Sequence, residues 1–148
     1  MARIMPYRYC THVTLAALLL GSASSRAADI QLSLVGAPSD ATIHAELVQL
    51  PAADWSGPPL RQLQTRSDPY FADIAPGRYA VRLFIDRNGN GQLDSSSRGI
   101  PREPVGFSGN PPLLDGLPAP EAAAFEHGQQ NSLLIIRLRQ DRRNAPAQ

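Results

Sequence analysis

The chain has 148 residues, with 14 lysines and arginines against 13 aspartates and glutamates, and a formal net charge of +1 at pH 7. Such a near-neutral chain lacks the basic surface that binding to nucleic acid or anionic lipid requires. A single cysteine excludes a disulfide within the chain. The length suits one domain with a hydrophobic core of its own, and the 14 prolines argue against a helical fold.

Residues 1–27 have the pattern of a cleavable secretory signal peptide. A positive start precedes an apolar run at 13–20, and small residues stand at the cleavage positions before Ala28. The apolar run is shorter than the ~20 residues that a membrane-spanning helix needs. We therefore expect export to the periplasm or medium, with no stable membrane anchor after cleavage.

Removal of this segment changes the composition of the chain. All 14 basic residues are arginines, and three of them leave together with the only cysteine, Cys10. Eleven arginines then remain against 13 acids, so the formal charge falls from +1 to −2. The mature domain therefore has neither a nucleic-acid footprint nor any thiol chemistry.

Short segments with strand-like alternation dominate the mature chain. Apolar and polar residues alternate at 29–34 and again at 42–50, separated by a Gly-Ala-Pro-Ser-Asp turn. After a loop at 51–59, weaker strand candidates occupy 60–64 and 69–74.

A Pro76-Gly77 turn leads into the strongest strand candidate, Tyr79–Ile85. A tyrosine that enters a strand after such a turn can pack its ring inward while its hydroxyl binds a backbone group. We expect this role for Tyr79, which is architectural and not chemical.

The last part of the chain contains fewer strand signals. The proline-rich stretch 101–120 predicts at best an edge strand plus coil, 121–125 one helical turn, and 133–138 a final strand. Residues 140–148 are polar and predict a disordered tail. The sequence thus predicts an all-β fold for 28–139: an antiparallel immunoglobulin-like or prealbumin-like β-sandwich of about seven strands.

A calcium-loop pattern follows the strand at 79–85. Oxygen-bearing side chains occupy positions one, three, five and nine, with glycine at six and leucine at eight, as in the calcium loop of EF-hands. The segment is Asp86-Arg87-Asn88-Gly89-Asn90-Gly91-Gln92-Leu93-Asp94. The predicted ligands are the side chains of Asp86, Asn88, Asn90 and Asp94 with the backbone carbonyl of Gln92.

The pattern is incomplete, because position twelve holds Ser97 where a bidentate acid is usual. Glu103, beyond a Gly-Ile-Pro bend, is the candidate replacement. So few carboxylates predict weak affinity, with a Kd of about 10⁻⁴ to 10⁻³ M, and hence a structural calcium ion. A metal-free turn stays open as an alternative, because Asn-Gly occurs twice and is the strongest short signal for a hairpin.

Several motifs follow one another in a fixed order along the mature chain. They are Tyr79-Ala80-Val81, the loop segment above, Gly99-Ile100-Pro101-x-Glu103, Gly106-Phe107-Ser108-x-Asn110 and Ala123-Ala124-Phe125. In this order they resemble domain of unknown function 2141, a family of small exported bacterial proteins, over roughly Ile30 to Leu138. The resemblance implies an immunoglobulin-like or prealbumin-like sandwich and export, but no activity. Ile85 and Pro104-Val105 depart from the family pattern, which often has histidine and Gly-Tyr there, so no role of that histidine carries over.

Catalytic patterns are thin in the mature chain. His44 and His127 are its only histidines, and no motif ties either to a nucleophile, so the sequence does not indicate an enzyme. His44 beside Glu46 is most simply a solvated pair on a strand, and His127 a loop residue. A zinc site is not predicted, because the mature chain offers too few histidine nitrogens and no cysteine sulfur.

Two aromatic residues are candidate binding positions. Trp55 lies in a loop where it can anchor that loop or present a platform to a sugar or peptide, and Phe107 lies in a glycine-rich stretch. Burial of Phe107 would favour a structural role. The favoured hypothesis is a calcium-stiffened exported module that binds a protein or glycan at the cell envelope. The alternatives are a small ligand-binding or hydrolytic protein with a site beside the acidic loop, and a metal-free structural domain.

Overall fold

The structure is a computed structural model that describes residues 26–114 and 116–140. The predicted signal peptide lies outside the described residues up to residue 25, and the predicted tail does so from 141 onward. The elements in chain order are β1 Ala28–Val35, β2 Thr42–Gln49, β3 Arg61–Thr65, β4 Tyr70–Ile74, β5 Gly77–Asp86, β6 Val105–Phe107, the 3₁₀ helix η1 Pro120–Ala123, β7 Ala124–His127 and β8 Ser132–Arg137.

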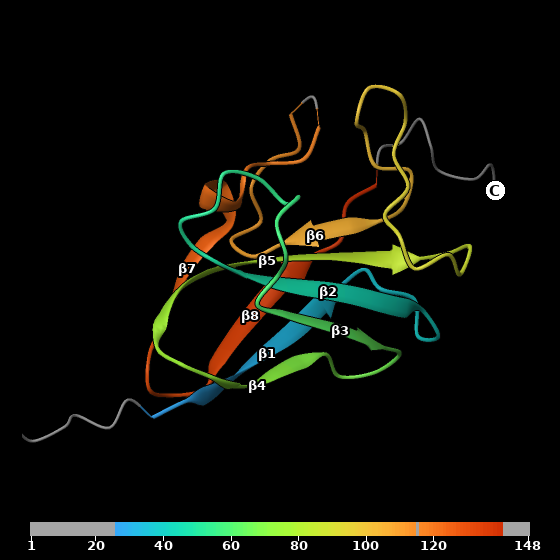
Figure 1. The fold of residues 1–148 in the computed structure, drawn as a ribbon. Helices are drawn as coiled ribbons and strands as arrows, with labels where there is room; N and C mark the ends of the chain where they lie inside the picture. The colour runs from blue at the N-terminus through green and yellow to red at the C-terminus, as the bar shows by residue number, and fades with distance from the viewer. Residues whose placement is uncertain (1–25, 115, 141–148) are drawn as a thin grey trace, which may run out of the picture.

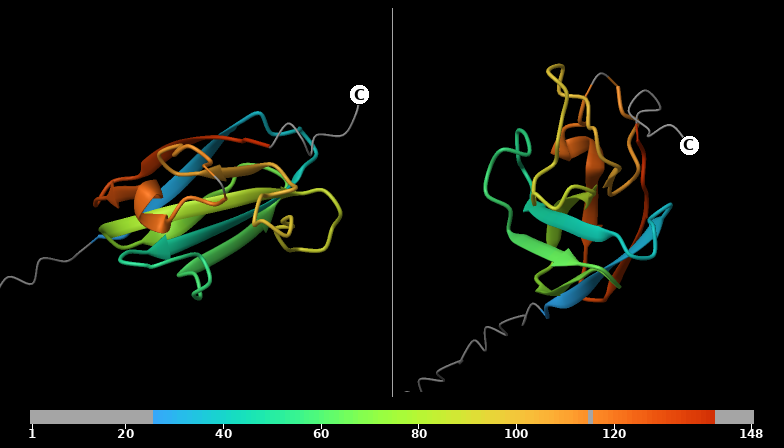
Figure 2. Two further views of the ribbon diagram at one scale, coloured as in Figure 1. Left: turned by 90° about the horizontal axis from the view of Figure 1, so that it is seen from above. Right: turned by 90° about the vertical axis from the view of Figure 1, so that its right-hand side faces the viewer.

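These strands form two sheets (Figure 1). One has the order β4-β1-β8; the other has the order β3-β2-β5-β6, and β7 also pairs with β5. All pairs are antiparallel except β1 with β8, which run parallel and lie side by side as the blue and red strands of Figures 1 and 2. The predicted all-β sandwich is confirmed, with eight strands and one parallel pair in the part of the chain that the structure describes.

The main core lies between the two sheets, where the period-two alternation predicted it. Each strand that supplies it turns every second side chain inward. The fully buried members are Ile30 of β1, Leu47 of β2, Val81 and Leu83 of β5, and Ile136 of β8.

Gly106 of β6 lies directly against β8 of the other sheet. A Cβ atom at this position would lie 2.5 Å from Cγ2 of Ile136 in β8, which is closer than carbon atoms can approach. Only glycine therefore lets β6 lie over β8 at this point.

Tyr79 occupies the predicted corner. Its ring is buried, and its hydroxyl donates a hydrogen bond to the carbonyl of Ala75 at 2.9 Å. This turn begins β5, a strand of ten residues that ends at Asp86.

A second core covers the outer face of the five-stranded sheet. Its buried residues are Leu50, Ala80, Phe84, Val105, Phe107 and Ala123. Trp55 packs against it from the loop after β2, Leu93 from the loop after β5, and Leu113 and Leu117 from the stretch before η1. Beside this core, the same face of β2 and β3 carries the polar side chains of His44, Glu46, Gln62 and Gln64. No helix among the described residues has the length and apolar character needed to span a bilayer.

Candidate functional site

β5 delivers Asp86 to the outer face of the sheet. Along this strand Tyr79, Val81, Leu83 and Ile85 face the main core, so Asp86 takes the opposite side together with Phe84. Asp86 is nevertheless only 8% exposed, because the loop that follows folds back over it.

The Asp86 carboxylate organises the first turn of that loop. One oxygen accepts the N–H of Gly89 at 2.7 Å, and the other accepts the N–H of Gly91 at 2.9 Å. Both glycines have positive φ, +75° and +73°, which a side chain would strain. The chain therefore wraps around a carboxylate and does not form the two-residue hairpin that Asn-Gly alone would favour.

The asparagines continue the wrapping. The side-chain oxygen of Asn88 accepts the N–H of Asn90 at 3.1 Å, and that of Asn90 accepts the N–H of Gln92 at 2.8 Å. Both amide groups also donate to Asp94, from Asn88 at 2.6 Å and from Asn90 at 3.3 Å. The predicted positions three, five and nine are thus brought together.

Glu103 joins the two ends of the loop. This buried carboxylate, 4% exposed, accepts the N–H of Arg87 at 2.8 Å and the N–H of Asp94 at 3.3 Å. A backbone bond from Arg102 to the carbonyl of Asp94, at 2.8 Å, adds to the same closure. In this arrangement Glu103 holds the backbone of the loop, and its role as a ligand stays a prediction.

The donor set suits a hard cation, because every predicted ligand side chain offers oxygen and none offers sulfur. Gln92 contributes its backbone carbonyl in the prediction, and its side chain is exposed. Within 26–114 and 116–140, however, no group of three or more His, Cys, Asp or Glu side chains is placed to hold a metal ion. Any ion here would depend on the two amides and the backbone as much as on carboxylates.

The electrostatics of Asp86 favour its charged form. Burial acts to raise the pKa of this carboxyl, but the N–H groups of Gly91 and Gly89 and the nearby His44 outweigh it. The pKa of Asp86 therefore lies below its ordinary value of 3.8. A carboxylate that stays ionised is what a cation ligand requires.

His44 connects this loop to the sheet, a contact that the sequence did not predict. Its ring stacks on Phe84 across the β2–β5 pair, with centroids 4.9 Å apart and an interplanar angle of 8°. Nε2 lies 3.3 Å from an Asp86 carboxylate oxygen, and the side chain is only 16% exposed. The expected solvated pair with Glu46 is wrong, because Glu46 binds the guanidinium of Arg82.

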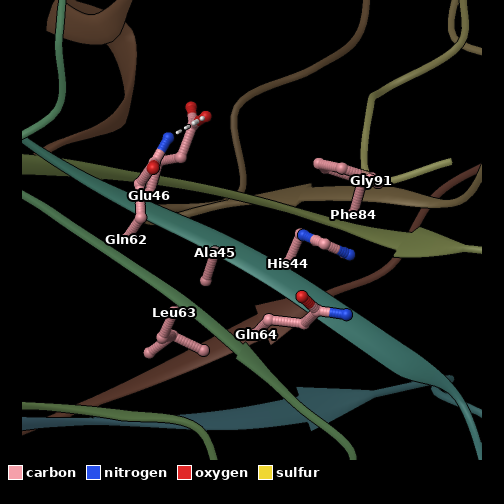
Figure 3. A pocket seen from close by; sticks show the side chains of 8 residues that line it. All are labelled: His44, Ala45, Glu46, Gln62, Leu63, Gln64, Phe84 and Gly91. Carbon is pink, nitrogen blue, oxygen red and sulfur yellow. Dashed lines mark hydrogen bonds between the residues drawn. The ribbon is translucent and has the colours of Figure 1, made fainter.

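A shallow depression of about 220 Å³ opens beside His44 (Figure 3). Its lining includes Glu46, Gln62 and Gln64 from β2 and β3 and Gly91 from the loop. Figure 3 shows the one hydrogen bond among these side chains, from Gln62 to Glu46 at 3.3 Å. Asp94 and Glu103 are not among the lining residues, so they do not converge with a histidine here as a hydrolytic site would require.

The two aromatic candidates lie together in the second core, against which Leu93 of the loop also packs. Phe107 is 3% exposed and Trp55 packs against it with centroids 5.6 Å apart. The Trp55 indole N–H donates to the carbonyl of Pro118 at 2.7 Å, and the Arg82 guanidinium lies 5.4 Å from its ring centroid. These contacts favour a loop anchor for Trp55, and burial removes Phe107 as a binding residue.

His127 is a strand residue and not the loop residue that the sequence indicated. It ends β7 at 3% exposure, with Nδ1 2.7 Å from the hydroxyl of Ser132 and Nε2 3.2 Å from the carbonyls of Ala28 and Ile74. Because both ring nitrogens have polar partners, the buried His127 side chain has a structural role.

The fold and the loop together define a small β-sandwich with an oxygen-rich loop after β5. The family model of domain of unknown function 2141, described as an uncharacterized protein conserved in bacteria, matches residues 60–134, just over half of the chain. The chain belongs to this family, which confirms the resemblance, although the match leaves β1 and β2 outside it. No curated protein and no solved structure matched the chain.

Proposed function

We propose that the protein is a non-enzymatic, exported β-sandwich module whose β5–β6 loop binds calcium as a structural ion. The observation that carries the proposal is the convergence of Asn88 and Asn90 on Asp94 in a loop already wrapped around Asp86. Hydrogen bonds within the loop hold its backbone in one arrangement, which supports the proposal because it reduces the ordering cost of binding.

The affinity follows from the donor set. A Kd of about 10⁻⁴ to 10⁻³ M is usual for extracellular modules with few charged ligands. At about 10 mM calcium, such a site stabilises the folded state by roughly 1.4 to 2.7 kcal/mol. For a domain of this size that corresponds to a rise in Tm of roughly 4 to 16 °C.

Thermal melting with chelator and with calcium tests the loop. We expect the rise in Tm for the wild-type protein and for Asp40→Asn, an exposed turn residue that serves as the matched control. Asp94→Asn removes the charge at position nine with little change of shape and should lose most of the rise. Magnesium should produce a smaller effect, because it demands stricter geometry. Equal Tm values in chelator and calcium would contradict the proposal.

Export and a place in the periplasm or medium form the second part of the proposal. They are supported by the signal-peptide pattern, and the first strand begins at Ala28, directly after the predicted cleavage position. Fractionation of expressing cells with mass spectrometry of the N-terminus tests this. Cytoplasmic accumulation of a chain that begins at Met1 would contradict it.

The stiffened loop would serve recognition of a protein or glycan at the cell envelope. Functional residues concentrate on loops that a rigid scaffold positions, and the loop residues Arg87 to Gln92 are exposed beside the depression at His44. Capture from envelope extract with immobilised protein, in calcium and in chelator, tests this part. We expect a captured protein or glycan that Asp94→Asn loses and Asp40→Asn retains; capture that ignores both calcium and Asp94→Asn would contradict it.

A further inference from the structure

The outer face of the three-stranded sheet carries exposed apolar side chains around the polar Gln31 and Ser33. Four large side chains on it are well exposed: Val35 at 48%, Tyr70 at 56%, Leu133 at 62% and Ile135 at 56%. The other sheet carries a second core on its outer face, whereas nothing among the described residues packs over this one in the same way. We call these four residues the outer apolar face.

The strand register places these side chains together. Gln31 of β1 is opposite both Tyr70 of β4 and Leu133 of β8, and Ser33 is opposite Ile135. Directly paired residues on neighbouring strands point to the same side of a sheet. The four side chains therefore form one surface and are not scattered singly, which is the arrangement that marks an interaction site.

Charges of opposite sign lie at opposite ends of this surface. Asp29 stands at the start of β1, and Arg137 stands at the end of the parallel strand β8. Beside Asp29, a depression of about 430 Å³ is lined by Asp68, Tyr70 and Leu133. Within the described residues none of Asp29, Asp68 and Arg137 makes an ion pair.

The edge of β8 is closed to strand addition. The Asn110 side chain accepts the N–H of Arg137 at 2.7 Å and donates to the carbonyl of Ile135 at 2.9 Å. These are the groups that an added strand would bind. Contact through the face is therefore favoured over contact through this edge.

We propose that the outer apolar face binds a second copy of this chain, turned end for end. This orientation sets Arg137 of each copy over the Asp29 end of the other and buries the four apolar side chains between them. Because the contact is two-fold symmetric, the pairing of Arg137 with the Asp29 end occurs twice in the dimer. An anionic lipid surface fits less well, because Asp29 and Asp68 border the face.

The size of the face makes the dimer weak. Three strands at about 4.8 Å spacing and six residues at about 3.3 Å each give a planar area of roughly 300 Å². Stable complexes bury about 800 Å² on each partner. We therefore expect a Kd between about 10 µM and 1 mM, which requires measurement at high concentration.

Sedimentation of the processed protein from about 10 µM to 1 mM tests the dimer. We expect a concentration-dependent shift from monomer to dimer. Ile135→Glu places like charges near the two-fold axis and should weaken association at least tenfold. Leu114→Glu is the matched control: this leucine is 77% exposed but lies outside the face, so its variant should associate as the wild type does.

A cross-link tests contact through this face independently. In a Cys10→Ser background, Ser33→Cys near the centre of the face should form a disulfide-linked dimer on oxidation, and Leu114→Cys should not. A monomer at every concentration overturns the proposal, as does a dimer that Ile135→Glu leaves intact. Binding to lipid vesicles without self-association would overturn it in favour of a membrane surface. The calcium loop lies elsewhere, so Asp94→Asn should leave this association unchanged.

Discussion

The substitution Glu103→Gln tests whether this buried carboxylate closes the loop or binds the proposed calcium ion. In the structure Glu103 accepts the N–H groups of Arg87 and Asp94 and so joins the loop ends. Hydrogen bonds to a charged group contribute about 1.5 to 3 kcal/mol each. Glutamine keeps one acceptor, but its NH₂ group then faces a backbone donor that has no other partner, which costs about 1 to 3 kcal/mol.

We therefore expect Glu103→Gln to lower the free energy of unfolding by about 2 to 4 kcal/mol, even in chelator. With a urea m-value of about 1.5 kcal/mol/M, the midpoint falls by roughly 1 to 3 M. Glu126→Gln is the control, because this side chain is 78% exposed and should change stability by less than about 0.5 kcal/mol. Wild-type stability in chelator with loss of the calcium response alone would refute the closing role and make Glu103 a ligand.

Three further experiments test the contact between β6 and β8, the ionisation of Asp86 and the binding of calcium. Gly106→Ala should destabilise by about 1 to 3 kcal/mol in urea unfolding, because its Cβ would lie 2.5 Å from a methyl carbon of β8. Gly57→Ala, with open space around it, should not. Because the pKa of Asp86 is lowered, its contribution to stability is complete above its ordinary value of 3.8 and is lost as pH falls through the lower folded-state pKa. Unfolding followed between pH 2 and 6, about two units either side of that value, should show this loss, and a flat profile would contradict it. Asn88→Asp should tighten calcium binding about tenfold by calorimetry and destabilise the metal-free loop through repulsion with Asp94; unchanged affinity would contradict direct ligation.

Much of the fold could be predicted because it depends on local patterns. Alternation at 29–34, 42–50 and 79–85 marks strands that bury one face, and the structure places β1, β2 and β5 there. The role of Tyr79 could be predicted because it depends only on a Pro-Gly turn followed by a tyrosine that enters a strand. β7 was missed: 124–127 is too short to show a period, and a 3₁₀ turn precedes it where one helical turn was expected.

The contacts around the site could not be predicted in the same way, because they depend on register. His44 meets Phe84 only because β2 and β5 pair in one alignment, and a shift of one residue would turn His44 to the other face. Glu103 reaches Arg87 across 16 residues of loop with no periodic signal. A polar residue at position 44 in an alternating strand is the one local hint, and it indicates only the outer face.

The hydrogen bonds of the loop give a reason to expect that the proposed calcium binding is weak, beyond the number of ligands. Both Asn88 and Asn90 turn their NH₂ groups toward Asp94, so the carboxylate at position nine has two donors within the loop. A calcium ion that binds Asp94 must share or displace these bonds, and only the difference between the two states appears as affinity. Because these hydrogen bonds join protein groups to one another, we expect calcium to change the stability of the loop more than its conformation.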